Sequence, residues 1–183
     1  MSGSNARRCV VLIGFMGAGK TTVGRILARR LRARFCDLDD VIEQRERKSI
    51  AEIFASSGEA AFRRMESAAL GELLQAREAG GDLVLALGGG AFVQKENRLA
   101  LHQAGAVTVL LEAPLEELRR RCHREGKARP LAREQAKFDE LFAARRADYE
   151  LARLRVQTLG KPVKQIAAEI ERLLKAAKAE VEK

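Results

Sequence analysis

A glycine-rich segment near the start of the chain carries the residues best suited to hold phosphate groups. The pattern G-x-x-x-x-G-K-[ST] is matched in full by Gly14-Phe15-Met16-Gly17-Ala18-Gly19-Lys20-Thr21, between an apolar run and a helical pattern. Glycines let successive backbone N–H groups point at phosphate oxygens, and the following helix N-terminus adds a partial positive charge. Lys20 would neutralise the β and γ phosphates, and the Thr21 hydroxyl would bind magnesium. The segment predicts a nucleoside triphosphate site, but it does not identify the second substrate.

Two carboxylates after the second apolar run are candidates for ion binding and proton transfer. Asp37 and Asp39 are two residues apart, and in an extended strand this spacing places both side chains on the same side. Ligands of parallel sheets bind beyond the carboxyl ends of the strands, so both acids should lie near the phosphate loop. One could hold the waters around magnesium, and the other could accept the proton of an attacking hydroxyl. A helix cap at Asp39 or Asp40 explains these acids equally well.

Short apolar runs alternate with longer amphipathic stretches, which is the pattern of βαβ units around a parallel sheet. The chain has 183 residues, an ordinary length for one domain, so we expect residues 1–183 to form a single α/β domain. Five strands are expected, at residues 9–13, 34–38, 83–87, 107–111 and 154–157.

Local signals predict where two helices start and where a loop lies. Ser49 with Glu52, and Ser56 with Glu59, have the S-x-x-E spacing of a capping box. The second box predicts the start of a helix that runs to the glycine pair 80–81. Residues 125–135 are polar and contain glycine and proline, so they predict a mobile lid.

Several motifs occur in an order that resembles the shikimate kinase family, from about Val10 to about Leu174. They are the phosphate loop, Asp37-Leu38-Asp39, Phe62-Arg63-Arg64 with Glu66, Gly88-Gly89-Gly90, Arg129-Pro130-Leu131, and Arg145 four residues before Tyr149. The resemblance implies a P-loop NTPase fold with a five-stranded parallel sheet flanked by helices, a lid, and a substrate-binding helical segment at about residues 39–66. It implies ATP-dependent phosphorylation of shikimate to shikimate 3-phosphate, a step of chorismate and aromatic amino acid biosynthesis.

On the acceptor side, the resemblance implies that Asp39 binds the ring hydroxyls of shikimate and serves as the base. Arg63 and Arg145 would clamp the shikimate carboxylate, because a planar guanidinium meets a carboxylate with two parallel hydrogen bonds. The bare backbone of Gly88, Gly89 and Gly90 would approach the substrate closely.

On the nucleotide side, the resemblance implies that Asp37 supports magnesium through water, together with Thr21. Arg129 on the lid would stabilise charge on the transferring phosphoryl group, and Arg121 would pack against adenine. The remaining contacts to ATP would come from Gly17, Ala18, Gly19, Lys20 and Thr22.

The chain departs from the family pattern at three places. Leu131 is followed by Ala132, where the family usually has a second leucine. Ala147-Asp148 precedes Tyr149, where the family commonly has Pro-Leu. The segment 158–162 on the expected adenine side does not align residue by residue.

Composition and charge exclude several other classes of protein. The net charge is +9, but basic residues are spread along the chain near glutamates at helical spacing, and one Tyr and no Trp are present to stack on bases, so we expect no nucleic-acid partner. No apolar run is long enough to span a bilayer, and the basic start lacks a signal-peptide pattern, so we expect a cytoplasmic protein without membrane contact. Three cysteines without metal-ligand spacing fit a reducing compartment. Without a large unexplained apolar face, we expect a monomer.

Two alternative functions remain open at this stage. One is a P-loop kinase for another small polyol acid such as gluconate, or for a nucleotide. The paired acids Asp37 and Asp39, with Arg63 and Arg145, argue against a nucleobase as acceptor. The other is a ligand-sensing module that keeps the fold and has lost turnover. Loss of Lys20, Asp39 or Arg129 would have favoured the sensing module, and all three are present.

Overall fold

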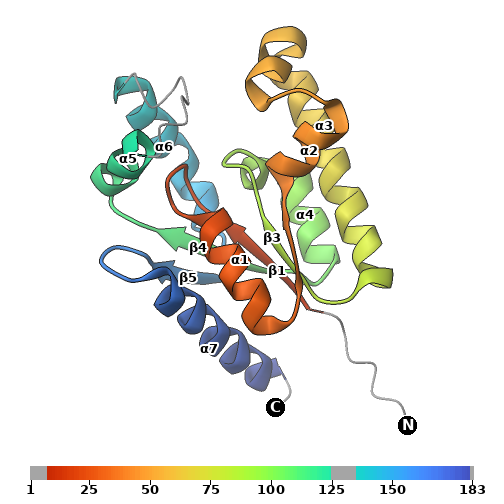
Figure 1. Cartoon of the computed structure of the whole chain (residues 1–183), viewed down its shortest axis with the longest axis vertical. Coiled ribbons are helices and arrows are strands. Elements are labelled where there is room, and N and C mark those ends of the chain that lie inside the picture. Colours follow the sequence, from red (N-terminus) through yellow and green to blue (C-terminus); the bar gives the residue numbers. More distant parts are fainter. Residues whose placement is uncertain (1–7, 125–134, 182–183) are drawn as a thin grey trace.

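The computed structural model describes residues 8–124 and 135–181, which form a parallel β-sheet covered by helices (Figure 1). The sheet has five strands in the order β2-β3-β1-β4-β5, and every pair of neighbours is parallel. The elements are β1 (Cys9–Ile13), α1 (Lys20–Leu31), β2 (Arg34–Asp37), α2 (Leu38–Glu46), α3 (Ile50–Gly80), β3 (Leu83–Ala86), the 3-10 turn η1 (Ala91–Val93), α4 (Lys95–Gln103), β4 (Val107–Glu112), α5 (Leu115–Arg124), α6 (Gln135–Tyr149), β5 (Leu154–Gln157) and α7 (Val163–Val181).

The predicted α/β class and all five predicted strands are confirmed, with strand ends shifted by no more than one residue. The central strand β1 pairs with β3 on one side and with β4 on the other, and all five of its residues are buried. Because helices cover both faces of the sheet, neither side of this strand meets solvent, and this explains its continuous run of apolar residues. The phosphate loop therefore begins at the carboxyl end of the central strand, which is buried along its whole length.

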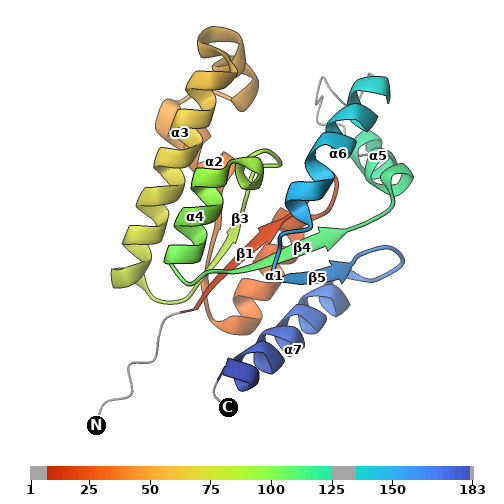
Figure 2. The same cartoon turned by 180° about the vertical axis from the view of Figure 1, so that it is seen from behind.

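Helices α1 and α7 cover one face of the sheet (Figure 1), and α3 and α4 cover the other (Figure 2). The buried side of α1 carries Val23, Leu27 and Leu31 at helical spacing. At Gly24 an added Cβ would lie 2.4 Å from Phe35 Cε2, so only glycine lets α1 approach β2 this closely. The position of α1 fixes the phosphate loop, because the loop connects it to β1.

Helix α3 is interrupted at Gly58, whose φ of 76° and ψ of 171° are not helical. The first predicted capping box is confirmed: Ser49 N and Oγ each donate to Glu52 Oε2 at 2.7 Å. The second is wrong, because Ser56 Oγ donates to the backbone oxygen of Ile53 instead. Gly58 breaks the helix two residues after Ser56, so Ser56 lies within the first helical segment and not at the start of the second.

Helical elements extend beyond the carboxyl ends of the strands on two sides. Helix α2 and the first part of α3 lie on one side, and α5 and α6 lie on the other (Figure 2). Within the described residues, no helix is long and apolar enough to cross a bilayer. The edge between these two groups of helices contains the predicted site residues.

Candidate active site

The phosphate loop folds tightly against β4 and α5. Gly14, with φ 143°, could not carry a side chain, because its Cβ would lie 2.7 Å from the backbone oxygen of Leu111. Gly17, with φ 78°, is similarly close to the backbone oxygen of Leu118, at 2.6 Å. Lys20 Nζ donates to the backbone oxygens of Gly14 at 2.9 Å and Phe15 at 3.2 Å. These bonds hold the ammonium group over the loop, where phosphates of a nucleotide would lie.

Thr21 and Asp37 come together at the start of α1 and the end of β2. Thr21 Oγ1 donates to Asp37 Oδ2 at 2.6 Å, so a hydroxyl and a carboxylate oxygen meet directly beside the phosphate loop. Magnesium prefers oxygen ligands and usually takes only one or two from the protein, with the rest from phosphates and water. No group of three or more His, Cys, Asp or Glu side chains in the described residues could hold a metal. The Thr21 and Asp37 pair nevertheless fits magnesium in the presence of nucleotide.

The structure corrects the predicted geometry of the two acids. Asp37 ends β2, but Asp39 lies in the first turn of α2, so strand alternation does not explain their shared side. Asp37 is the N-cap of α2, and its side chain accepts a hydrogen bond from Asp39 N at 3.2 Å. The cap prediction was therefore right about a helix start and wrong about the residue. Asp39 is left to face the glycine turn.

Each glycine of the turn after β3 faces a different charged side chain. An added Cβ at Gly88 would lie 2.5 Å from Asp39 Oδ1, and one at Gly89 would lie 3.0 Å from Arg145 Nη1. At Gly90 the distance to both terminal nitrogens of Arg63 would be 2.5 Å. The three side chains come from α2, α6 and α3, so the turn gathers one carboxylate and two guanidinium groups from distant parts of the sequence.

Arg63 is held in place by a buried carboxylate. Its Nη1 donates to Glu66 Oε2 at 2.9 Å, and Gln94 Nε2 donates to the same oxygen at 3.0 Å. Burial raises the pKa of Glu66, whereas the neighbouring charge of Arg63 opposes that shift. Glu66 Oε1 is buried and has no hydrogen-bond partner among the described residues. Glu66 thus fixes Arg63 with one oxygen and keeps the other on the side of Gly88, 3.0 Å from the position of an added Cβ.

Tyr149 and Phe15 complete the surroundings of Arg145. The Tyr149 hydroxyl donates to the backbone oxygen of Gly89, and burial raises the pKa of Tyr149 to about 12. Arg145 Cζ lies 6.0 Å from the ring centroid of Phe15, a residue of the phosphate loop. The acceptor-side arginine therefore contacts both the glycine turn and the phosphate loop.

The sequence motifs include Glu66 and Tyr149, but the sequence indicated no role for either residue. Gln94 was not predicted at all. Glu66 stands three residues after Arg63, and Tyr149 four after Arg145, the spacing at which side chains meet on a helix. This spacing was a usable signal for both. Gln94 carried none, because it reaches Glu66 only through the folded chain.

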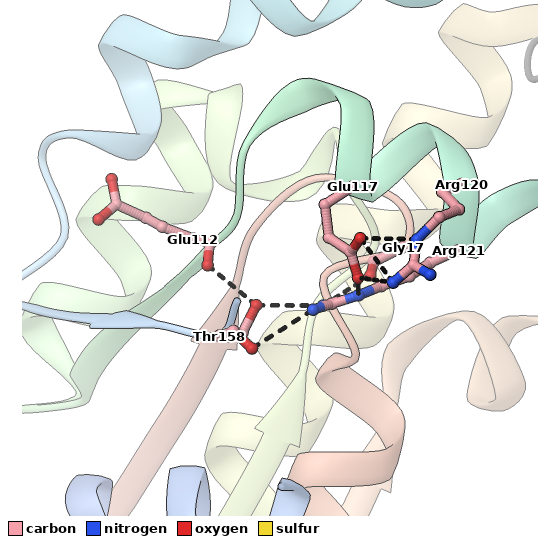
Figure 3. A network of polar contacts seen from close by, with 6 residues as sticks. All are labelled: Gly17, Glu112, Glu117, Arg120, Arg121 and Thr158. Carbon is pink, nitrogen blue, oxygen red and sulfur yellow. Dashed lines mark hydrogen bonds and ion pairs between the residues drawn. The ribbon is translucent and has the colours of Figure 1, made fainter. Parts of the chain in front are cut away.

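Arg121 connects three segments on the nucleotide side (Figure 3). It donates to Thr158 Oγ1 at 3.1 Å, to the Thr158 backbone oxygen at 3.3 Å and to the Gly17 backbone oxygen at 3.5 Å. Glu117 accepts from both Arg120 and Arg121, and these hydrogen bonds lower its pKa to about 2. Within the arginine run 119–121, the guanidinium group of Arg121 donates to the phosphate loop at Gly17.

Replacing Thr158 with valine should weaken nucleotide binding selectively. The valine removes the hydroxyl that accepts from Arg121 and donates to the Glu112 backbone oxygen at 2.9 Å, while the Thr158 N–H keeps its own bond to that oxygen at 2.8 Å. Because a hydrogen bond to a charged group contributes about 1.5 kcal/mol and Arg121 keeps other partners, we expect the KM for ATP to rise roughly three- to tenfold. The KM for the acceptor should not change. Thr108→Val is a matched control, since Thr108 accepts from Arg153 N away from this network.

The structure describes every predicted site residue except Arg129, and it describes only the last residue of the predicted lid. Arg129 and nearly all of the predicted lid lie outside the described residues, which resume at Gln135. Thr22 lies on α1 directly after Thr21 and is exposed. Asp37 bonds to Thr21 from the end of β2, and the remaining predicted site residues belong to the phosphate loop, to the Arg121 network, or to the group around the glycine turn.

A phosphate loop beside a cluster of arginines and carboxylates defines the class of the protein as a P-loop kinase of small molecules. The chain belongs to the shikimate kinase family, whose family model matches residues 16–175. A shikimate kinase of Geobacter metallireducens is 42% identical over 173 residues, which are 93% of each chain.

Solved structures support the same family. Shikimate kinase from Acinetobacter baumannii, in complex with shikimate, superposes with a TM-score of 0.84 at 36% identity, covering 94% of this chain and 95% of that one. A gluconokinase from Sinorhizobium meliloti reaches a TM-score of 0.58 at 18% identity, covering 96% of this chain and 98% of the gluconokinase, which shows a shared fold alone.

Proposed function

We propose that the chain transfers the γ-phosphoryl group of ATP to a ring hydroxyl of shikimate, forming shikimate 3-phosphate for chorismate biosynthesis. The observation that supports this most strongly is the glycine turn, which faces Asp39, Arg63 and Arg145 next to the phosphate loop. A small acid with hydroxyl groups matches this combination of one carboxylate and two guanidinium groups. Family membership favours shikimate among such acids.

On the nucleotide side, the proposed contacts to phosphate are the backbone of Gly17, Ala18 and Gly19 and the side chains of Lys20, Thr21 and Thr22. Thr21 and Asp37 would hold magnesium, which would neutralise phosphate charge during transfer. Arg121 would contact adenine. Arg129, outside the described residues, would add positive charge to the transferring group.

On the acceptor side, Arg63 and Arg145 would bind the carboxylate, and the bare backbone of Gly88 to Gly90 would leave room for the ring. Asp39 would orient the attacking hydroxyl and accept its proton as the oxygen–phosphorus bond forms and the bond to ADP breaks. Lys20 would stay on the β and γ phosphates throughout. Positioning and charge would supply most of the rate enhancement.

We propose a single domain over residues 1–183, with substrate-binding helices at about 39–66 and a lid at about 125–135. We further propose a cytoplasmic monomer whose partners are shikimate and ATP. Gluconate phosphorylation and ligand sensing without turnover remain the alternatives; the retained Lys20 and Asp39 favour an enzyme over a sensor.

Replacing Arg145 with alanine should reduce shikimate affinity and leave ATP affinity unchanged. Loss of a charge-assisted pair of about 2–3 kcal/mol corresponds to a dissociation constant roughly 30- to 150-fold higher. Calorimetric titration of each substrate measures both affinities. Arg146→Ala is the matched control, because the Arg146 side chain is 72% exposed and pairs with Glu150. An equal loss of both substrates would indicate general damage and would count against this assignment.

A further inference from the structure

The turn η1, which follows the three glycines, is held by side chains of α4. Asn97 Nδ2 donates to the backbone oxygen of Ala91 at 2.9 Å, and Asn97 is 2% exposed. Arg98 Nη1 lies 2.9 Å from the backbone oxygen of Phe92 and 2.6 Å from that of Val93. All three carbonyls of η1 thus accept from two consecutive residues of α4, which anchors the turn at the end remote from β3.

The same arginine connects this turn to α6. Arg98 Nη1 also lies 2.8 Å from Asp148 Oδ1, and the two side chains are 22% and 27% exposed. The next residue, Tyr149, donates to the backbone oxygen of Gly89. In the last turn of α6, Tyr149 therefore binds Gly89 directly, and Asp148 is joined to η1 through Arg98 of α4.

These contacts act on the helical turn that carries Arg145. Arg145 precedes Tyr149 by four residues, so it projects from the same side of α6 one turn earlier. Earlier in α6, the rings of Phe138 and Phe142 pack on Phe15, and their centroids lie 5.0 and 5.3 Å from the Phe15 centroid. These edge-to-face rings restrain the earlier part of α6, whereas the polar contacts at 148 and 149, which weaken steeply when they are bent, act on the end of the helix. The contacts at 148 and 149 can therefore help to set the rotation of the turn that includes Arg145.

We propose that Asp148 and Arg98 are positioning residues for the acceptor: their ion pair docks the last turn of α6 on η1 and so places Arg145 opposite Gly89. The inference rests on the proposed function only in taking Arg145 as a ligand of the acceptor carboxylate. The competing explanation is an ordinary surface pair, which would affect stability slightly and substrate binding not at all.

Asp148→Asn tests the proposal, because it keeps the shape of the side chain and removes its charge. We expect the KM for shikimate to rise roughly three- to tenfold, a range usual for contacting pairs, with the KM for ATP changed by less than about twofold. Asp148→Glu should recover part of the loss. In a double-mutant cycle, adding Asp148→Ala to Arg98→Ala should raise the shikimate KM little further, since the pair is already broken.

Glu150→Gln is the matched control. It disrupts the ion pair between Arg146 of α6 and Glu150, the residue directly after α6, whose side chains are 72% and 45% exposed. Hydrogen–deuterium exchange of peptides covering residues 135–149 gives a readout that needs no substrate. Asp148→Asn should speed exchange there, and Glu150→Gln should not.

The outcomes separate the two proposals. An inactive parent protein whose Asp148→Asn variant still exchanges faster would contradict the proposed function and leave the docking contact supported. An active parent whose variant keeps its shikimate KM would overturn the positioning role. Equal increases in both KM values with a lower melting temperature would also overturn it, because they would indicate a merely structural pair.

Discussion

Asp39→Asn should fold normally and lose most of its turnover, by roughly 10²- to 10⁴-fold in kcat, the usual contribution of a positioned base. Asparagine has the same shape but accepts a proton poorly, and α2 keeps its start because Asp37 provides the cap. Steady-state rates at saturating shikimate and ATP measure the loss. The melting temperature of the variant should stay close to that of the parent.

The neighbouring acid gives the control for this variant. Asp40 is exposed and belongs to the same first turn of α2, so Asp40→Asn changes the charge of the helix start by the same amount. We expect it to keep nearly full activity. Unchanged turnover in Asp39→Asn would remove Asp39 from proton transfer.

Gly88→Ala should reduce kcat/KM for shikimate by about 100-fold, because misplacing a reacting group by about 1 Å can have an effect of this size. The new Cβ would lie 2.5 Å from Asp39 Oδ1 and 3.0 Å from Glu66 Oε1, so Asp39 must shift. Gly88 does not have a positive φ, so alanine fits the backbone conformation and the substitution acts through steric crowding alone. Titration with ATP should give an unchanged affinity.

Gly71→Ala separates this crowding from a general effect of losing a glycine. Gly71 lies within α3, and no atom would lie within 4 Å of its Cβ. Alanine should raise the free energy of unfolding by about 0.5–1 kcal/mol and leave kinetics unchanged. Full activity in Gly88→Ala would show that Asp39 can move without loss, which contradicts the proposed geometry of the acceptor site.

The phosphate loop and the strands could be predicted because their signals are local. The loop pattern fixes backbone positions that need glycine, and buried parallel strands appear as continuous apolar runs. The Ser49 cap followed from spacing alone for the same reason. The Ser56 box failed because the helix is broken at Gly58 and not at Ser56, and the Ser56 hydroxyl bonds back to Ile53.

The arrangement of the site could be predicted only in part. Asp37 was correctly placed beside the phosphate loop, but the geometric reason for pairing it with Asp39 was wrong because a helix begins between them. Three charged side chains face Gly88, Gly89 and Gly90, and this arrangement depends on how α2, α3 and α6 pack. No periodicity within one segment contains that information.

Contacts between distant segments were likewise invisible in the sequence. Arg98 and Asp148 are 50 residues apart, and Arg121 and Thr158 are 37 apart. Each residue alone looks like an ordinary surface group, since arginine and aspartate are mostly exposed in proteins. Their partners became evident only when the helices were placed around the sheet.

The most direct test of the proposed reaction is an ADP-release assay with ATP and magnesium that compares shikimate, gluconate and no acceptor. We expect ADP release that depends on shikimate, with gluconate no better than the reaction without acceptor. Release stimulated by gluconate and not by shikimate would contradict the proposed acceptor. ATP binding without stimulation by either acid would contradict the proposed enzyme activity and favour a sensing module.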